Sequence, residues 1–362
     1  MKYTLEELSL IWLDSFIGLE YKHKVKIYEF LVQTQKVSEG LMLAKDYIVK
    51  SVGENEFKTM LSSANQTYLD FVLDELERGD IVAVTIESDR YPSLLKDIEL
   101  KPLVLYAKGN LELLETPTFA IVGSRKSLPL SISIASEYAK SLSQHFTLVT
   151  GIAEGVDSEV IKSALSTTKN IISVIAGGFD NVYPSTNKDL FEKVASVGLV
   201  LSEHPPKVVP RPYHFPIRNR IIAGLSKGVL VVSGGLKSGT LYTAEYAGEY
   251  ARDLFAVPYS VGVASGQGTN ELIKRGAVLT DKVEDILEFY SLNNNDSSEQ
   301  LSKEEKEILS VLANGNAHIE KICGELNKSA HEMLAQLSIL EIKGVIVKSG
   351  NVYGLVRNYS ED

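Results

Sequence analysis

The stretch FAIVGSRKSLPLSISIASEYAKSLSQHFTLVTG (residues 119–151) predicts the fold of the central part of the chain. It contains two short apolar runs, 119–123 and 147–151, with an amphipathic segment between them. Such runs are typical of strands buried on both faces, and a helix is the usual connection between two parallel strands. The stretch therefore predicts a strand, a helix that begins near Leu130, and a second, parallel strand.

The same alternation continues to residue 279. Amphipathic segments separate further apolar runs at 171–176, 199–202, 228–233, 254–258 and 277–279. This order predicts an α/β fold with a Rossmann-like, mostly parallel sheet. Several runs end in glycine or serine, where the chain turns into a helix and a small residue lets a phosphate approach the helix N–H groups. We therefore expect one edge of the sheet to bind anions.

Regions with other patterns flank this sheet. Thr4 and Glu7 have the spacing of a helix capping box, and apolar residues recur at helical spacing after them. Near the other end, three amphipathic segments precede two apolar runs around Ser-Gly-Asn (residues 349–351), which is the order of a winged helix. The predicted organisation is a helical domain of sterile-alpha-motif or helix-hairpin-helix type (1–76), an extended Rossmann-like domain (77–290), a polar linker (291–300) and a winged-helix-like domain (301–357).

The composition excludes several classes of protein. Of the 362 residues, 44% are hydrophobic and 23% are charged, which is enough apolar material for a folded chain of two or three domains. The single cysteine, Cys323, excludes an internal disulfide and a multi-cysteine zinc site. We expect a cytoplasmic location and no membrane partner, because no apolar stretch is long enough to span a bilayer and residues 1–14 include acids. Neither a cofactor nor a bound metal is predicted.

Charge is unevenly distributed along the chain. With 37 basic and 47 acidic residues the net charge is −10, so most of the surface repels nucleic acid and any nucleic-acid site must be a local patch. The segment between Glu203 and Glu245 contains no acid. Its basic residues are Lys207, Arg211, Arg218, Arg220, Lys227 and Lys237. In an acidic chain, this segment is the strongest candidate for an anion site.

The block His-Phe-Pro-Ile-Arg-Asn-Arg (residues 214–220) stands at the centre of that segment. Pro216 is expected to open a helix, from which Arg218 and Arg220 point in different directions. Asn219 has an amide for a base or a backbone, and Phe215 has a ring on which a base can stack. The structural alternative is that one arginine bridges strands and loops while Phe215 packs in the core. Cations, an amide and an aromatic ring together suit single-stranded nucleic acid.

Glycine loops on both sides of this block are expected to bind phosphates. The first is Gly-Ser-Arg-Lys (residues 123–126), and the second, Gly-Gly-Leu-Lys-Ser-Gly-Thr (residues 234–240), follows a neighbouring strand. Each precedes a helix whose N–H groups can meet a phosphate, although tight turning alone also accounts for such glycines. Neither loop contains Gly-Lys-Ser or Gly-Lys-Thr, so ATP hydrolysis is not indicated. The predicted DNA-binding residues are Gly123, Ser124, Arg125, Lys126, Gly151, Lys188, Phe215, Arg218, Asn219, Arg220, Lys237, Ser238, Gly239 and Thr240.

These motifs resemble the DNA-processing protein A (DprA/Smf) family. The resemblance rests on Ile-Val-Gly-Ser-Arg (121–125), Thr-Gly-Ile-Ala (150–153), Phe-Pro-Ile-Arg-Asn-Arg (215–220) and Ser-Gly-Thr (238–240). It implies a protein that binds incoming single-stranded DNA in natural transformation, protects it, helps to load the RecA recombinase and forms homodimers through the Rossmann-like domain. It also implies that Arg125 and Lys188 contact DNA.

The chain departs from the pattern of this family at three positions. The family usually has a histidine at Ile161, a basic residue near Glu154 and an acid near Ser233. The resemblance implies that Glu154 weakens one edge of the DNA site, whereas the glycine loops need none of the three lost groups.

Two enzymatic alternatives compete with DNA binding. The segment from Gly234 to Glu245 also resembles the motif of nucleoside monophosphate phosphoribohydrolases, in which Glu245 would be the catalytic carboxylate. Its spacing is longer than in that motif, and the Arg-Asn-Arg block has no role there. A dinucleotide-dependent dehydrogenase is excluded, because Gly-x-Gly-x-x-Gly does not follow the first strand. We therefore expect a non-catalytic DNA-binding protein with no catalytic residue.

Overall fold

The structure is a computed structural model, and it describes residues 3–292, 302–313, 315–342 and 345–355. It divides into two compact units, Met1–Leu292 and Asn293–Asp362. Most of the predicted linker, from residue 293 to residue 300, lies outside the described residues, as do positions 356 and 357 of the predicted winged-helix-like domain.

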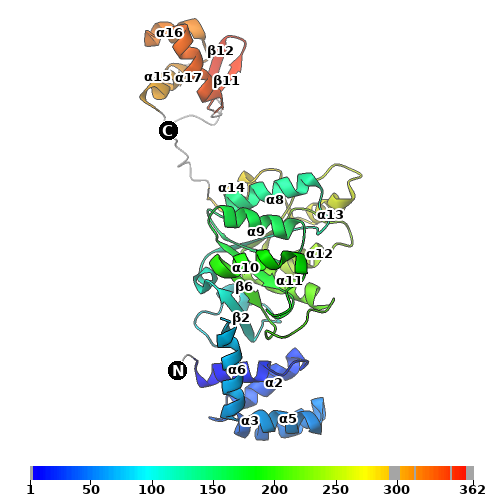
Figure 1. Cartoon of the computed structure of the whole chain (residues 1–362). Helices are drawn as coiled ribbons and strands as arrows, with labels where there is room; N and C mark the ends of the chain where they lie inside the picture. The colour runs from blue at the N-terminus through cyan, green and yellow to red at the C-terminus, as the bar shows by residue number, and fades with distance from the viewer. Residues whose placement is uncertain (1–2, 293–301, 314, 343–344, 356–362) are drawn as a thin grey trace. The chain divides into compact units, whose positions relative to one another are not determined.

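Helices α1 to α6 form the first part of the larger unit (Figure 1). They are α1 (Leu5–Asp14), α2 (Tyr21–Leu31), α3 (Val37–Leu43), α4 (Lys45–Val52), α5 (Glu54–Ser63) and α6 (Gln66–Arg78). The predicted capping box is confirmed, since Thr4 Oγ1 accepts from Glu7 N at 3.2 Å and Glu7 Oε2 accepts from Thr4 N at 2.8 Å. Leu10 and Leu76 pack into the same core as the sheet, so the helical part and the sheet form one compact unit.

A single sheet lies at the centre of this unit. Its strands are β1 (Val82–Thr85), β2 (Val104–Gly109), β3 (Thr118–Val122), β4 (Thr147–Thr150), β5 (Ile171–Ile175), β6 (Leu199–Ser202), β7 (Gly228–Val231), β8 (Asp253–Ala256) and β9 (Val278–Leu279). The strand order is β1-β2-β6-β5-β4-β3-β7-β8-β9. All neighbours from β6 to β9 are parallel, and only β1 and β2 pair antiparallel to their neighbours. The predicted α/β fold with a mostly parallel sheet is confirmed.

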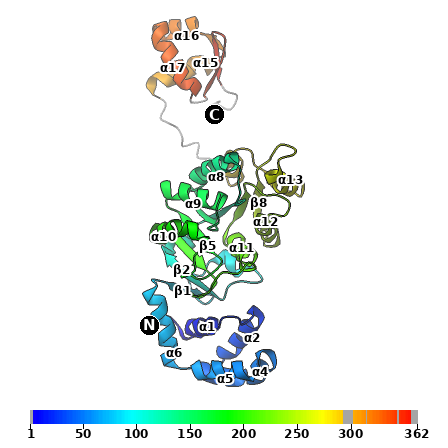
Figure 2. The same ribbon diagram turned by 45° about the vertical axis from the view of Figure 1, so that its right-hand side comes forward.

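Helices cover both faces of the sheet. One layer contains α8 (Pro129–Leu142), α9 (Val156–Ser166), α10 (Lys188–Val197) and α14 (Glu284–Phe289), and the other contains α7 (Ser93–Lys96), α11 (His214–Leu225) and α12 (Thr240–Glu249). The remaining elements are α13 (Gln267–Lys274) and the 3-10 helices η1 (Leu111–Glu115), η2 (Ser185–Asn187) and η3 (Ala264–Gly266). Phe119 and Ile121 of β3 face the first layer, while Ala120 and Val122 face the second. Figure 2 shows strands β5 and β8 between the two layers. Burial on both faces explains why the strands are continuous apolar runs in the sequence.

Strands β3 and β7 are the neighbours at which the chain reverses its direction across the sheet. From β3 the chain proceeds through β4, β5 and β6 to one side, and it then returns to β7 on the other side of β3. Phe119 pairs with Gly228 and Val122 with Val231, so both strands end at the same level. In open α/β sheets, ligands bind in the crevice that such a reversal leaves beyond the carboxyl ends of the strands.

The smaller unit has the predicted order of a winged helix. Its elements are α15 (Lys303–Ala313), β10 (Ala317–His318), α16 (Ile319–Leu326), α17 (Ala330–Ile342), β11 (Ile346–Ser349) and β12 (Val352–Leu355). Gly350 and Asn351 connect β11 to β12, and Gly350 has a φ of 63°, a conformation that favours glycine. The core of this unit is formed by Ile308, Leu312, Ile322, Met333, Leu337 and Tyr353, among others.

Candidate nucleic-acid interface

A pocket of about 750 Å³ lies beyond the ends of β3 and β7, and we call it the switch-point pocket. The loops after these two strands and the first turns of α11 form most of its lining. Most of the residues predicted to bind DNA line it, namely Gly123, Ser124, Arg125, Lys126, Phe215, Arg218, Asn219, Ser238, Gly239 and Thr240. Residues far apart in the sequence thus meet at the edge of the sheet where an anion site was expected.

Close backbone packing holds the first loop in place. A Cβ atom at Gly123 would lie 2.8 Å from Val156 Cβ at the start of α9, so a side chain at position 123 would push the helix away. Gly155 has a φ of 81°, and a Cβ there would collide with the carbonyl oxygens of Ser124 and Arg125. The loops after β3 and β4 therefore touch through their backbones, which only glycine permits.

Arg218 contributes a buried positive charge to the pocket. It is 8% exposed, its Nη1 donates to the carbonyl of Val174 in β5, and its Nε donates to Asn219 Oδ1 at 3.1 Å. Burial lowers the pKa of Arg218 to about 10, against the opposing effect of Asp157, so the guanidinium is charged at neutral pH. Burial also raises the pKa of Asp157, although Arg218 opposes this shift. Because less water screens it, a mostly buried guanidinium attracts a phosphate more strongly than a fully solvated guanidinium does.

Aromatic rings and a second guanidinium stand at the mouth of the pocket. The Arg125 guanidinium lies 5.1 Å from the centre of the Phe215 ring, within cation–π range. Tyr183 meets the same ring edge-on, with 5.5 Å between the ring centres, and Tyr183 is 54% exposed. Arg125 is exposed and Phe215 is half-buried, so both remain accessible to a ligand.

The backbone amides of the second glycine loop are less available than predicted. Gly234 N donates to Ser265 O at 2.6 Å, Ser238 N to Gly235 O at 2.9 Å, and Thr240 N to Ser238 Oγ at 3.3 Å. In the first loop, Ser124 N donates to Ser233 Oγ at 3.2 Å. The expectation that these N–H groups lie bare for a phosphate is wrong for these four amides, because the loops satisfy them internally. At these four positions, nearby side-chain cations and not the backbone amides are left to attract an anion.

Asn219 connects the two halves of the pocket. Its Oδ1 accepts from Arg218, and its Nδ2 donates to the carbonyl of Gly239 at 3.1 Å. Asn219 thereby fixes the second glycine loop against α11 and orients the Arg218 guanidinium.

Three further predicted residues do not line the pocket. Gly151 is buried behind it, where a Cβ would collide with Asp157 and lie 2.8 Å from Arg218 Nη2, so its role is to let these two side chains approach. Lys188 is exposed as the first residue of α10, and Lys237 is exposed in the second glycine loop. Lys237 directly precedes the lining residue Ser238, whereas Lys188 lies in a different segment, after η2.

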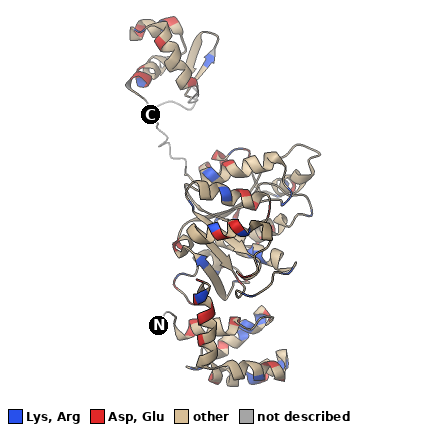
Figure 3. Cartoon of the chain, viewed as in Figure 1, with Lys and Arg blue, Asp and Glu red and all other residues tan. Residues whose placement is uncertain are grey.

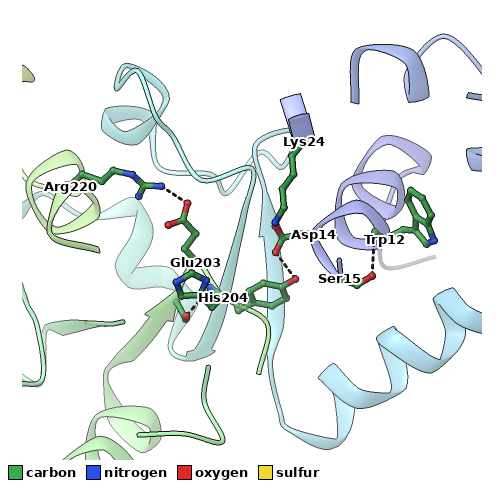
Figure 4. Close-up of polar contacts among 9 residues, drawn as sticks. Trp12, Asp14, Ser15, Lys24, Glu203, His204 and Arg220 are labelled. Atoms are coloured by element: carbon green, nitrogen blue, oxygen red, sulfur yellow. Dashed lines mark hydrogen bonds and ion pairs between the residues drawn. The ribbon is translucent and has the colours of Figure 1, made fainter. Parts of the chain in front are cut away.

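Arg220 is also outside the pocket, and it forms an internal ion pair. It is 3% exposed, and its Nη2 donates to Glu203 Oε1 in the loop that follows β6 (Figure 4). Among the described residues, Arg220 Nε and Nη1 have no hydrogen-bond partner. In this conformation the guanidinium is not accessible to DNA, so the structural alternative considered for one arginine of the block applies to Arg220.

A histidine pair lies beside this ion pair. The rings of His204 and His214 are 4.4 Å apart, and burial lowers the pKa of both. For His204 the pKa falls from 6.5 to about 4, against the opposing effect of Glu203. His204 is therefore neutral at neutral pH. Asp14 is drawn near His204 in Figure 4, and it accepts hydrogen bonds from Lys24 Nζ at 2.6 Å and Tyr106 Oη at 2.9 Å.

We expect acid to destabilise the larger unit through His204. The pKa of His204 is about 4 in the folded protein and 6.5 in the unfolded chain. Between pH 4 and pH 6.5, the unfolded chain therefore binds the proton more readily than the folded protein does. The free energy of unfolding should be undiminished above pH 6.5 and should fall by about 2 kcal/mol between pH 7 and pH 5 from this group. Urea denaturation across this range should show a flatter pH dependence for His204→Gln; an equally steep dependence would contradict the assignment.

Some residues of the pocket were not among the predicted ones. Asp157 is the second residue of α9, whose N-cap is Gly155. Its Oδ2 accepts a hydrogen bond from Ala153 N at 3.3 Å, and the residue lines the pocket. Tyr183 comes from the loop before η2, and its contact with Phe215 joins segments with no local pattern in common. The Tyr-Pro pair at 183–184 was the available signal for Tyr183.

Glu245, the carboxylate of the phosphoribohydrolase alternative, lies elsewhere. It is exposed on α12 and lines a separate pocket with residues of α13 and β9, not the switch-point pocket. Figure 3 shows basic and acidic residues mixed along the helices, so no whole layer of helices is basic.

Within the described ranges, no helix is long and apolar enough to cross a bilayer, and no group of three or more His, Cys, Asp or Glu side chains is placed to hold a metal ion.

Comparisons with known proteins agree on one family. The model of the family "DNA recombination-mediator protein A" matches residues 82–291, and that of the "DprA winged helix domain" matches residues 294–350. DNA processing protein DprA of Bacillus subtilis is 39% identical over 219 residues, which are 60% of this chain and 74% of the relative. Protein Smf of Escherichia coli is 31% identical over 289 residues, 75% of this chain and 76% of the relative.

Solved structures agree with this result. The X-ray structure of DNA processing protein A from Streptococcus pneumoniae matches with a TM-score of 0.67 and 31% identity, covering 80% of this chain and 98% of that one. A structure of DNA processing protein A from Helicobacter pylori, described as giving insights into a single-stranded DNA binding mode, matches with a TM-score of 0.53 and 30% identity over 57% of this chain and 95% of that one. The fold, the motifs at its switch point and these matches show that the chain belongs to the DNA recombination-mediator protein A (DprA/Smf) family.

Proposed function

We propose that this protein binds single-stranded DNA in the switch-point pocket and acts in the cytoplasm as a recombination mediator of natural transformation. The observation that carries the proposal is the convergence of Arg125, Lys126 and Arg218 around the half-buried ring of Phe215. Cations that track a phosphate backbone, combined with a ring for stacking, are the elements of single-strand recognition. The binding mode described for the Helicobacter pylori relative supports the same ligand.

The arrangement favours a single strand over a duplex. Phe215 and Tyr183 both line the pocket, and a base can stack on such a ring only when it is turned out from its neighbours. In a duplex the base faces are hidden in the stack, so exposing one costs a few kcal/mol, and this cost is least for a base that is already single-stranded.

Protection of the DNA and loading of RecA complete the proposed role, and both rest on membership of the family. A homodimer formed through the Rossmann-like domain is also proposed. The edge strand β9 supports it, because Leu279 is 49% exposed there and Phe289 in the adjoining pocket is 50% exposed. An open sheet edge with exposed apolar side chains is suited to pairing with a second copy.

A non-catalytic role fits the pocket better than hydrolysis. Glu245 lies outside it, and the acid inside it, Asp157, is buried and bound to the amide of Ala153. A general acid or base must reach the reacting atom, and Asp157 is instead held by the loop that contains Gly151.

Titration of single-stranded and duplex oligonucleotides of the same sequence tests the proposal. Fluorescence anisotropy at several salt concentrations should show at least about 10-fold tighter binding of the single strand, with an affinity that falls as salt rises. Equal affinity for the two forms would overturn the proposal. Release of free base from a nucleoside monophosphate would instead favour the phosphoribohydrolase alternative.

A further inference from the structure

A smaller chamber of about 90 Å³ opens beside the switch-point pocket. The two share Arg125, Ala153, Tyr183, Phe215 and Arg218, so a strand bound in the pocket passes the mouth of the chamber. The rest of its lining is Ile152, Glu154, Ala176 and Pro184. Among these described lining residues Glu154 is the only acid, and its side chain is exposed at the edge of a lining that also contains two guanidinium groups.

Hydrogen bonds between two loops hold Glu154 at this position. Its Oε1 accepts a hydrogen bond from Thr186 Oγ1 in η2 at 3.0 Å. The neighbouring Asn187 donates to Ile152 O at 2.8 Å and to Ser158 Oγ at 2.9 Å, which ties η2 to the loop that carries Glu154. The carboxylate is therefore held in place on the exposed side of the chamber.

The chemistry of the lining is asymmetric. A carboxylate only accepts hydrogen bonds and a guanidinium only donates them, so together they suit a flat group whose edge has both a donor and an acceptor. Cytosine has that edge, with an exocyclic amino group next to its ring nitrogen and carbonyl oxygen. Thymine presents a carbonyl oxygen where cytosine has the amino group, and this oxygen repels a carboxylate. The small volume of the chamber favours a pyrimidine over a purine.

We propose that the chamber holds one base of the bound strand and that Glu154 accepts a hydrogen bond from its amino group, which makes the protein prefer cytosine to thymine. This inference rests on the proposed binding of single-stranded DNA and adds a base preference to it. Glu154 also repels the phosphate backbone, so its negative charge lowers the affinity for every sequence. A base contact is a function for a carboxylate whose negative charge is otherwise unfavourable for binding DNA.

The test compares homopolymers of deoxycytidine and deoxythymidine of equal length, by fluorescence anisotropy at neutral pH and about 0.1 M salt. The wild-type protein should bind the cytosine strand about 5-fold more tightly, as expected for one hydrogen bond to a base edge. Glu154→Gln should bring the ratio close to one and should strengthen thymine binding, since the repulsion is gone. The control Glu192→Gln removes an exposed acid of α10 that lines neither pocket, and it should leave the ratio unchanged.

The possible results separate the two proposals. A wild-type protein with equal affinity for both strands, or a ratio that Glu154→Gln leaves intact, would overturn the base preference while single-strand binding stands. A ratio that Glu192→Gln also abolishes would overturn it too, because the effect would then be general electrostatics. Absence of binding to either strand would overturn the proposed function and the base preference together.

Discussion

Replacing Arg125 and Lys126 by alanine should weaken single-stranded DNA binding by on the order of 10- to 100-fold at about 0.1 M salt. Both side chains are exposed and line the switch-point pocket, and Arg125 also stacks on Phe215. Because each is expected to neutralise one phosphate, the slope of log affinity against log salt should become shallower by about 1.4. The thermal stability should not change, since neither side chain is buried.

The matched control is Lys140→Ala with Lys193→Ala, which removes the same charge from exposed positions of α8 and α10 outside the pocket. This pair should reduce affinity less than 3-fold or so, because charges beyond a Debye length are screened. Equal losses in the two double variants would mean that the total charge, and not the pocket, attracts the strand. An unchanged salt slope in the Arg125 and Lys126 variant would show that neither residue contacts phosphate.

The sheet and its switch point were predictable, because each step depends on local pattern. Strands buried on both faces need apolar residues at every position, and Phe119 to Val122 shows this without a gap. The parallel connection then requires a helix, and the glycines at the strand ends mark the turns into it. Thr4 with Glu7, within three residues of each other, was equally visible.

The roles of Arg218 and Arg220 were not separable from the sequence. Two residues apart on a helix, they point about 200° from each other, so one of them must face away from any single ligand. Which one does so depends on Glu203, which reaches α11 from the end of β6. Likewise, Ser233 Oγ and Ser265 O accept hydrogen bonds from amides of the two glycine loops, although both serines are distant in sequence from the residues that donate to them. Contacts of this range leave no periodic signal in the chain.

Breaking the ion pair between Glu203 and Arg220 should lower the free energy of unfolding more than any surface substitution. Glu203→Leu leaves the guanidinium of Arg220, whose side chain is 4% exposed, without its countercharge, at a cost of about 3–5 kcal/mol. Arg220→Met should cost less, because the Glu203 side chain is 21% exposed and retains some contact with water. Urea denaturation of the single variants measures both values.

The double variant Glu203→Leu with Arg220→Met should regain most of this stability. Both charges of a buried ion pair lose hydration on folding, which costs free energy. Arg220 Nε and Nη1 also lack hydrogen-bond partners among the described residues. Apolar replacements of both side chains remove these costs. Its single-stranded DNA affinity should stay within about 2-fold of the wild type, because Arg220 does not line the pocket, whereas Arg218→Met should lose at least about 10-fold. If the stable double variant bound DNA as poorly as Arg218→Met, Arg220 would have to leave its ion pair on binding. The second arginine of the Arg-Asn-Arg block would then be a DNA contact as well as a structural residue.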